Sequence, residues 1–266
     1  MIAETRRAAR FRRAGFWLLG WVGLGVAMLI WQVVAVVDHS PLIPTFSATV
    51  VALWHLLTSS FVAGNLVPSL IRLVIGFVVS AVIGVVVGLF TGYYRAVREW
   101  TAAVFDFSRS LPTPLLIPVA LVLFGLGGTM VVVIIASAAV WPVLINTSNA
   151  TAALEPTLVD TARCLGLRGP ALLFKVVLPA VSPKIFAGLR VAISVSLAVL
   201  VVAEILGGSS GIGYFISAAQ QSFQITDSYA GVLVLCLLGW FADSLFLFVE
   251  RRLLVWQRGI VGGGHG

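Results

Sequence analysis

The sequence contains very little charge for its length of 266 residues. Asp, Glu, Lys and Arg together make up 10% of the chain, hydrophobic residues make up 60%, and the mean hydropathy is +1.08. A soluble domain carries about 25% charged residues. This shortage of charge excludes an ordinary soluble protein. It predicts an all-α, polytopic membrane protein, because helices satisfy their own backbone polar groups in a bilayer.

The residue clusters of enzymes and metal sites are also missing from the sequence. The three histidines, His39, His55 and His265, are scattered, with no carboxylate at catalytic or metal-binding spacing. The two cysteines, Cys164 and Cys236, have neither metal nor redox spacing. The nucleotide-binding pattern Gly-x-x-x-x-Gly-Lys-Ser/Thr does not occur. We therefore expect no catalytic activity, metal or cofactor in this chain, and any source of energy must belong to another chain.

Long apolar runs predict six membrane-spanning helices, since a span needs about 20 apolar residues. The expected spans are residues 16–37, 66–92, 100–124, 129–145, 185–206 and 229–249. The third is expected to be interrupted by Pro112, Pro114 and Pro118. The first is too long for the apolar region of a signal peptide and lacks a cleavage site, so we expect an uncleaved anchor. Residues 1–64 would comprise a basic N-terminus, this span and an outer amphipathic helix at 46–57. Residues 65–252 would form the transport core and 253–266 a tail.

The distribution of basic residues predicts the orientation of the chain. Fifteen of the 17 Lys and Arg residues lie in segments 1–15, 93–98, 150–190 and 250–266, whereas segments 38–65, 125–128 and 207–228 contain none. Basic residues concentrate on the cytoplasmic side of membrane proteins. Both termini and the central loop at 151–183 should therefore be cytoplasmic. This asymmetry explains the net charge of +7 without any binding of nucleic acid.

The central loop is the longest part of the second half that could not lie in a bilayer. Its pattern predicts two short helices, near 156–165 and 170–177, separated by a turn at Gly166. Pro170 suits the first turn of a helix, because its missing N–H would have no partner there. Pro179 is expected to end the second helix. An ordinary amphipathic hairpin between two spans is the simpler alternative.

The residue order of this loop resembles the cytoplasmic coupling loop, or EAA loop, of ABC importer permeases. The shared order is acidic-x-Ala, three residues, Gly, nine residues, aliphatic, one residue and Leu-Pro, with Asp, Thr and Val here in place of Glu, Ala and Ile. In that family the loop docks into a groove of the ATPase subunit. The resemblance assigns this contact to Asp160, Thr161, Ala162, Gly166, Leu167, Val176, Leu178 and Pro179.

Two further segments resemble the nitrate/sulfonate/taurine branch of the same family. They are Arg109–Pro118 with Phe124–Gly127, and Ala203-Glu204 with the Gly/Ser run that follows. The resemblance implies a type I importer permease in the inner or plasma membrane of a prokaryote. Its partners would be a second copy, two ATPase subunits holding ATP and magnesium, and an extracytoplasmic substrate-binding protein. Its substrate would be an alkanesulfonate, taurine, nitrate or bicarbonate.

Three other functions stay open at this stage. A permease of the same family could carry a different small solute, such as a thiamine-precursor pyrimidine or an aromatic carboxylate. An ion-coupled secondary carrier is the alternative from another class, although the sequence shows no symmetry between its halves. A membrane-embedded enzyme is disfavoured, because the ionisable residues do not cluster.

Polar residues within the spans are the candidates for the translocation pathway. Arg109 either faces the pathway and attracts an anion, or forms a structural ion pair with Asp106 three residues earlier. The other candidates are Pro112, Asn146 and Glu204. Asp243, inside the last span, is expected to pair with a Lys or Arg that the sequence does not identify.

Small residues mark two further features. The run after Glu204 is either an outer gate that meets a substrate-binding protein or a solvated loop, and the gate candidates are Gly208, Ser209, Ser210, Gly211 and Gly213. Along the second span, small residues recur at every fourth position, from Gly76 to Gly92. Such a ridge lets helix backbones approach closely. Because it drifts around the helix, we expect it to contact more than one neighbour.

Overall fold

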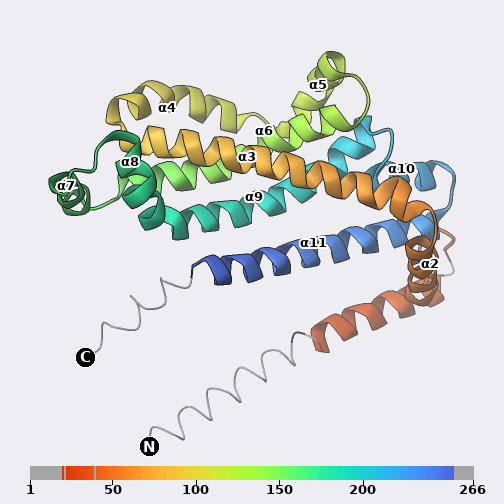
Figure 1. Ribbon diagram of the computed structural model, residues 1–266. Helices are drawn as coiled ribbons and strands as arrows, with labels where there is room; N and C mark the ends of the chain where they lie inside the picture. Colours follow the sequence, from red (N-terminus) through yellow and green to blue (C-terminus); the bar gives the residue numbers. More distant parts are fainter. Residues whose placement is uncertain (1–19, 21, 39, 255–266) are drawn as a thin grey trace, which may run out of the picture.

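The computed structural model describes residues 20, 22–38 and 40–254, and the regular structure in this part of the chain is helical (Figure 1). Helices α3, α6 and α9 pack against one another through the centre, and α11 packs against α9, α10 and α2. Helices α7 and α8 lie at one end of the molecule, and α5 and α10 lie at the other. The described helices are Val22–Asp38, α2 (Phe46–Thr58), the π-helical η1 (Val62–Leu66), α3 (Val67–Tyr93), α4 (Arg95–Ser110), the 3-10 helix η2 (Thr113–Leu116), α5 (Ile117–Phe124), α6 (Gly128–Ala152), α7 (Pro156–Cys164), α8 (Gly169–Leu172), the π-helical η3 (Leu173–Val177), α9 (Leu178–Gly207), α10 (Ile212–Gln221) and α11 (Ile225–Leu253).

The described helices account for four or five membrane spans, so the predicted count of six is not confirmed. The four that are long and apolar enough are Val62–Tyr93, Gly128–Ala152, Gly169–Gly207 and Ile225–Leu253. A fifth exists only if α4 and the segment Thr113–Phe124 are counted together. The expected first span, 16–37, lies partly outside the described residues, and its described helix is too short to span alone.

The third expected span, 100–124, is interrupted near its first proline, in line with the expected break. Helix α4 begins earlier than expected, at Arg95, and its axis makes an angle of 88° with the following segment Thr113–Phe124. Leu111 and Pro112 are both extended at the break, with ψ of 122° and 115°. A residue before proline is pushed out of the helical region, which accounts for the conformation of Leu111.

Pro179 does not end a helix, contrary to the sequence prediction. Helices α8, η3 and α9 form one continuous helix from Gly169 to Gly207. The Leu178 N–H bonds to the Leu173 carbonyl five residues earlier, which widens the helix immediately before Pro179. The same device precedes Pro68, where the Val67 N–H bonds to the Val62 carbonyl. A proline ring clashes with the carbonyl four residues earlier, and the wider turn relieves that clash.

The Gly/Ser-rich segment 207–228 is more than the solvated loop considered as one alternative. It contains α10, whose Ile212 is fully buried and whose Ile216 is 4% exposed. Both side chains pack in a core cluster with Ile135 of α6, Leu200 of α9 and Val234 of α11. Helix α10 therefore belongs to the packed core at this end of the molecule.

Helices α3 and α6 approach closely through the predicted ridge of small residues. An added Cβ at Gly84 would lie 2.7 Å from the Val143 Cβ, and one at Gly88 would lie 2.7 Å from the Thr147 Cβ. The nearest atoms to Gly76 and Gly92 also belong to α6. The ridge glycines therefore meet one neighbour, rather than the several expected from the drift of the ridge.

Replacing Gly88 by alanine should destabilise the protein by overpacking this contact. The new Cβ would lie 2.9 Å from the Leu144 carbonyl oxygen, a backbone atom that cannot move aside. Overpacking of a tight contact costs about 1–3 kcal/mol. The matched control is Gly64→Ala, because no atom lies within 4 Å of an added Cβ there. Thermal unfolding of the detergent-purified variants is the measurement, and equal midpoints for both would contradict the predicted packing.

Candidate functional site

The central loop turns through a glycine-dependent helix cap. Helix α7 ends at Cys164, and Gly166 follows with φ of +85°. The Gly166 N–H bonds to the Arg163 carbonyl at 2.9 Å, and the Leu167 N–H bonds to the Ala162 carbonyl at 3.1 Å. These two bonds define a Schellman motif, in which glycine occupies the left-handed position. The turn predicted at Gly166 is therefore confirmed.

Buried side chains hold the loop against the core while its first helix stays exposed. Leu172, Leu173 and Val177 are 1%, 3% and 0% exposed. Leu173 and Val177 pack against Leu89 of α3. Sequence reasoning selected the half-buried Val176 instead of the fully buried Val177 beside it.

The remaining predicted loop residues divide into exposed and packed groups. Asp160 and Thr161 are exposed on α7, whereas Ala162 is 5% exposed. Leu167 and Leu178 are half-buried, and Pro179 is exposed. The loop therefore offers polar side chains of α7 to its surroundings while its own base is fixed in the core. Cys164, at the end of α7, is also exposed.

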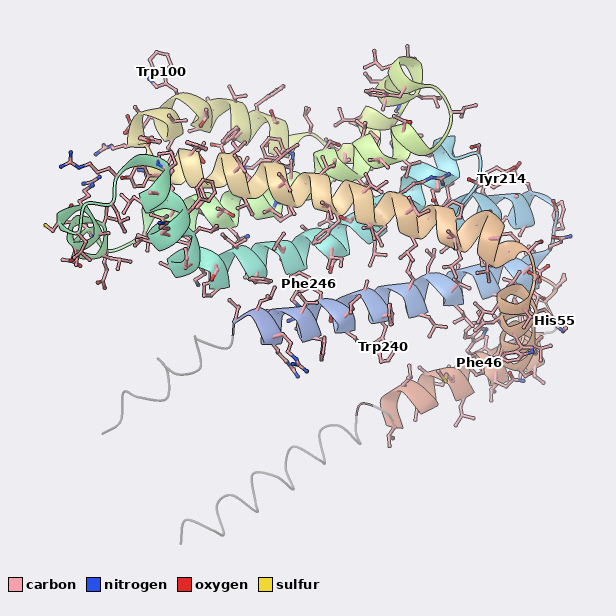
Figure 2. All side chains as sticks on the ribbon, viewed as in Figure 1. Phe46, His55, Trp100, Tyr214, Trp240 and Phe246 are labelled. Carbon is pink, nitrogen blue, oxygen red and sulfur yellow. The ribbon has the colours of Figure 1, made fainter. Side chains whose placement is uncertain are left out.

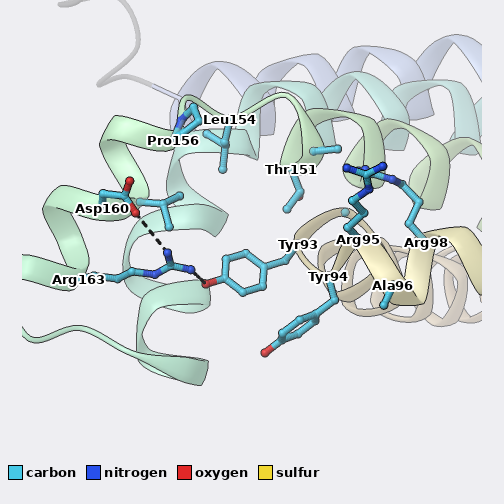
Figure 3. A pocket seen from close by; sticks show the side chains of 13 residues that line it. Tyr93, Tyr94, Arg95, Ala96, Arg98, Thr151, Leu154, Pro156, Asp160 and Arg163 are labelled. Atoms are coloured by element: carbon cyan, nitrogen blue, oxygen red, sulfur yellow. Dashed lines mark hydrogen bonds and ion pairs between the residues drawn. The ribbon is translucent and has the colours of Figure 1, made fainter.

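A cleft of about 550 Å³ separates α7 from the ends of α3 and α6 and the start of α4 (Figure 3). Arg163 crosses it, with its Nη1 3.2 Å from Asp160 Oδ1 and its Nη2 donating to the Tyr93 hydroxyl at 3.0 Å. The bond to Tyr93, followed by the charge of Asp160, raises the pKa of Arg163. Sequence reasoning did not select Tyr93 or Arg163 for this site.

At the opposite end, Glu204 is fully buried in a network of polar groups. Its carboxylate accepts bonds from the Ser69 hydroxyl at 2.7 and 2.8 Å, from Arg72 Nη1 at 2.9 Å and from the Gly213 N–H at 3.0 Å. Losing one partner of a buried ion pair typically costs about 3–5 kcal/mol, because the other charge stays buried. The network therefore fixes the C-terminal end of α9 to α3.

The same network holds the predicted outer-gate segment. Arg72 also donates to the Ser210 carbonyl and hydroxyl, at 2.6 and 2.7 Å. The Gly211 N–H donates to Asn65 at 3.1 Å, and a Cβ at Gly211 would overlap the Glu204 carboxylate. Gly213 is buried, Gly208 is half-buried and Ser209 is exposed. The gate role stays a prediction, but the segment is anchored to α3 and α9 rather than free.

The predicted pathway residues do not form one cluster. Asp106 and Arg109 pair within α4 at 3.0 Å, as their spacing predicted, and both side chains are more than half exposed. Asn146, in α6, donates to the Pro142 carbonyl at 2.8 Å and lies beside Gly188 of α9. Pro112 is exposed at the break after α4. Glu204 bonds to α3, so its geometry favours a structural role, and the pathway roles of all five stay predictions.

Asp243 has the basic partner that the sequence could not identify. Arg190 Nε lies 3.1 Å from Asp243 Oδ1, and this pair joins α9 to α11. Both side chains are about half exposed, at 50% and 41%. We find no group of three or more potential metal ligands among the residues described.

Comparisons with known proteins agree with this architecture. Residues 80–255 match the family model described as binding-protein-dependent transport system inner membrane component. The chain is 30% identical to the aliphatic sulfonates transport permease protein SsuC of Bacillus subtilis, over 98% of this chain and 95% of that protein. It is 34% identical to the bicarbonate transport system permease protein CmpB of Synechococcus elongatus, over 61% of this chain and 59% of that protein.

A solved structure also shares the fold. The inward-facing MetNI methionine ABC transporter superposes with a TM-score of 0.62 at 18% identity, over 73% of this chain and 94% of that chain. At this identity the likeness concerns the fold alone. The family model and the sulfonate relative, which matches over nearly the whole chain, also assign the family. The chain belongs to the family of binding-protein-dependent transport system inner membrane components, the permease subunits of ABC importers.

Proposed function

We propose that the chain is the transmembrane subunit of an ATP-driven importer and forms the pathway for a small oxyanion or organic anion. Two copies would form the pathway, and a substrate-binding protein would deliver the solute from outside. Two ATPase subunits, which hold ATP and magnesium, would bind the coupling loops. Both termini would lie in the cytoplasm of a prokaryote. The chain itself would hold no cofactor and catalyse no reaction.

The geometry of α7 carries the proposal. This helix is exposed, lies at one end of the molecule and begins and ends with turns. Its base is fixed by buried Leu172 and Val177, and α8 continues without interruption into the spanning helix α9. A force applied to α7 by a bound ATPase would therefore reach a membrane span through a short, rigid connection. An ordinary connecting hairpin does not need this fixed base.

The substrate class rests on the relatives and on charge. The named relatives include permeases for aliphatic sulfonates and for bicarbonate, and both solutes are small anions. At about 100° per residue, the charged residues of α4 fall within an arc of roughly 100°. They are Arg95, Arg98, Glu99, Asp106 and Arg109. A half-exposed arginine on this polar face could attract an anion into a water-filled pathway.

The alternatives predict different partners or ligands. An ion-coupled carrier would work without an ATPase, so co-purification with an ATPase subunit separates it from the importer. A same-family permease for a thiamine-precursor pyrimidine or an aromatic carboxylate would keep the ATPase but respond to a different binding protein. Identification of the ligand of that binding protein decides between these solutes and a small oxyanion.

Replacing Gly166 by valine should weaken ATPase binding and abolish transport while membrane levels stay near normal. The site has room for a side chain, but a β-branched residue at φ of +85° is strained by roughly 1–3 kcal/mol. Insertion depends on the spans and not on this turn. Pull-down of the ATPase, beside quantification of the subunit in membranes, is the measurement.

The matched control for this turn is Gly166→Asn, because asparagine tolerates the left-handed conformation. It should keep most ATPase binding, whereas Gly166→Val loses it. Asp160→Lys, which reverses a charge on exposed α7, should act in the same direction as valine. Normal ATPase binding and transport in both Gly166→Val and Asp160→Lys would show that the loop is a plain connector.

Cysteine labelling in intact cells should place α7 and the outer segment on opposite sides of the membrane. Ala171 and Ser209 are both exposed, so each accepts a reporter cysteine. The natural Cys164 and Cys236 are first replaced by serine and alanine. A cysteine at 209 should react with an impermeant thiol reagent, whereas one at 171 should react only after lysis. The reverse pattern would overturn the proposed orientation.

Replacing Arg109 by glutamine should slow uptake if this residue attracts the substrate. Loss of a charged hydrogen bond of about 1.5–3 kcal/mol corresponds to roughly a tenfold loss or more. Assembly and basal ATPase activity should persist, and Arg109→Lys should retain part of the uptake. Degradation of the Arg109→Gln subunit would instead assign the pair with Asp106 a structural role.

A further inference from the structure

The cleft behind α7 carries more positive charge than its own acidic residues neutralise. Its lining includes Arg95, Arg98 and Arg163, and Asp160 is the acidic residue among the lining positions. Tyr93 and Tyr94 add two phenol groups at the end of α3 (Figure 3). The cleft thus gathers cationic and hydroxyl donors from three segments in a volume of about 550 Å³.

The three arginines differ in how many of their N–H donors are already hydrogen-bonded. Arg163 bonds to Asp160 and Tyr93, at 3.2 and 3.0 Å. Arg95 donates a bond from Nε to Glu99 at 2.7 Å, which leaves its two terminal nitrogens available to another acceptor. Arg98 is half-buried, and no side chain in the described part of the protein bonds to its guanidinium.

The spacing of Arg95 and Arg98 makes the unneutralised charge more costly. They are three residues apart on α4 and therefore lie on the same face of that helix, where like charges repel. Figure 3 shows both side chains extending along the same edge of the cleft. Glu99 pairs with Arg95 and offsets part of this repulsion, and an anion placed between the two arginines would offset the rest and accept bonds from their free N–H donors.

The chemistry of the lining points to a phosphate group. Guanidinium groups bind phosphate through paired hydrogen bonds. The volume is within the range of pockets that hold small molecules. A carboxylate offers two oxygens, whereas a phosphate offers enough oxygens to accept paired bonds from both Arg95 and Arg98.

The position of the cleft relative to the spans suggests where the phosphate comes from. The cleft lies at the end of α3, where Tyr93 and Tyr94 follow a long apolar run. Trp100 is 87% exposed and points away from α4 (Figure 2). Tyrosine and tryptophan concentrate at the level of the lipid headgroups, and basic pockets between helices on the cytoplasmic side attract anionic headgroups.

We propose that Arg95 and Arg98, at the α4 edge of this cleft, bind a phosphate group, either from the headgroup of an anionic phospholipid or from a soluble phosphate compound. The site rests on the local geometry and does not depend on the proposed function.

Thermal unfolding of the purified full-length protein in neutral detergent tests the site. The probes are phosphatidylglycerol, phosphatidylcholine and sodium phosphate, each compared with sodium chloride at equal ionic strength. We expect phosphatidylglycerol to raise the midpoint in a saturable manner and phosphatidylcholine to have little effect. In Arg98→Gln the concentration for half the shift should rise roughly tenfold, as for the loss of one charged hydrogen bond.

The matched control is Arg251→Gln, which removes the same charge from an exposed position at the end of α11. It should respond to phosphatidylglycerol like the natural protein. If Arg98→Gln does not yield folded protein, Arg95→Gln removes the neighbouring guanidinium and should weaken the response in the same direction. A saturable shift with sodium phosphate assigns a soluble source, and a shift with phosphatidylglycerol alone assigns the lipid.

The proposal is overturned if neither phosphate-bearing probe shifts the midpoint, or if Arg98→Gln and Arg251→Gln weaken the response equally. Native mass spectrometry of the same samples gives a second readout, since bound phosphatidylglycerol should be retained by Arg251→Gln and lost from Arg98→Gln. Neither measurement involves an ATPase or transport. A negative result therefore leaves the proposed importer function untouched, and a negative ATPase pull-down leaves the phosphate site untouched.

Discussion

The need to pair every backbone polar group inside a membrane governs this structure. Hydrocarbon offers no water to replace a lost bond, so each proline in a span requires a local solution. Before Pro68 and Pro179 the helix widens by one residue. Among the described residues, Thr147 has the one buried side-chain polar atom without a partner.

The buried network around Glu204 also pairs groups that have lost contact with water, and here two of the groups are charged. Removing a carboxylate and a guanidinium from water costs several kcal/mol for each ion. The network offsets this cost by giving Glu204 three donors, from Ser69, Arg72 and Gly213, while Arg72 also bonds to Ser210. We infer that such an expensive arrangement is kept because it fixes geometry. The ends of α3, α9 and α10 are held as one unit, while the extended residues Leu111 and Pro112 mark an 88° bend after α4.

Local features of this fold could be predicted from sequence, whereas contacts between distant segments could not. The turn at Gly166 depends on six consecutive residues, and the Asp106–Arg109 pair depends on helical spacing, so both were predictable. Arg72 and Glu204 are 132 residues apart, and the sequence around either residue does not identify the other as its partner. One signal was present, because a charge within a span requires a partner. In the predicted orientation, both residues would lie near the outer ends of their spans.

The prolines show a different limit of sequence reasoning. A proline ordinarily ends a helix, and Pro179 was expected to do so. The chain instead adopts a π turn, and the helix continues for 39 residues from Gly169 to Gly207. At 1.5 Å per residue this helix is about 58 Å long. It begins three residues after the Gly166 turn and ends three residues after Glu204.

One uninterrupted helix therefore connects the loop at one end to the buried network at the other. If Pro179 ended a helix, a flexible joint would separate these two sites, and motion of α7 would be lost in that joint. The π turn keeps the backbone bonded through the proline, and the Arg190–Asp243 pair ties the middle of this helix to α11. A displacement of α8 would therefore be carried along α9 to the segment that Glu204 holds. The two ends of the fold are thus linked by one continuous helix rather than by a series of side-chain contacts.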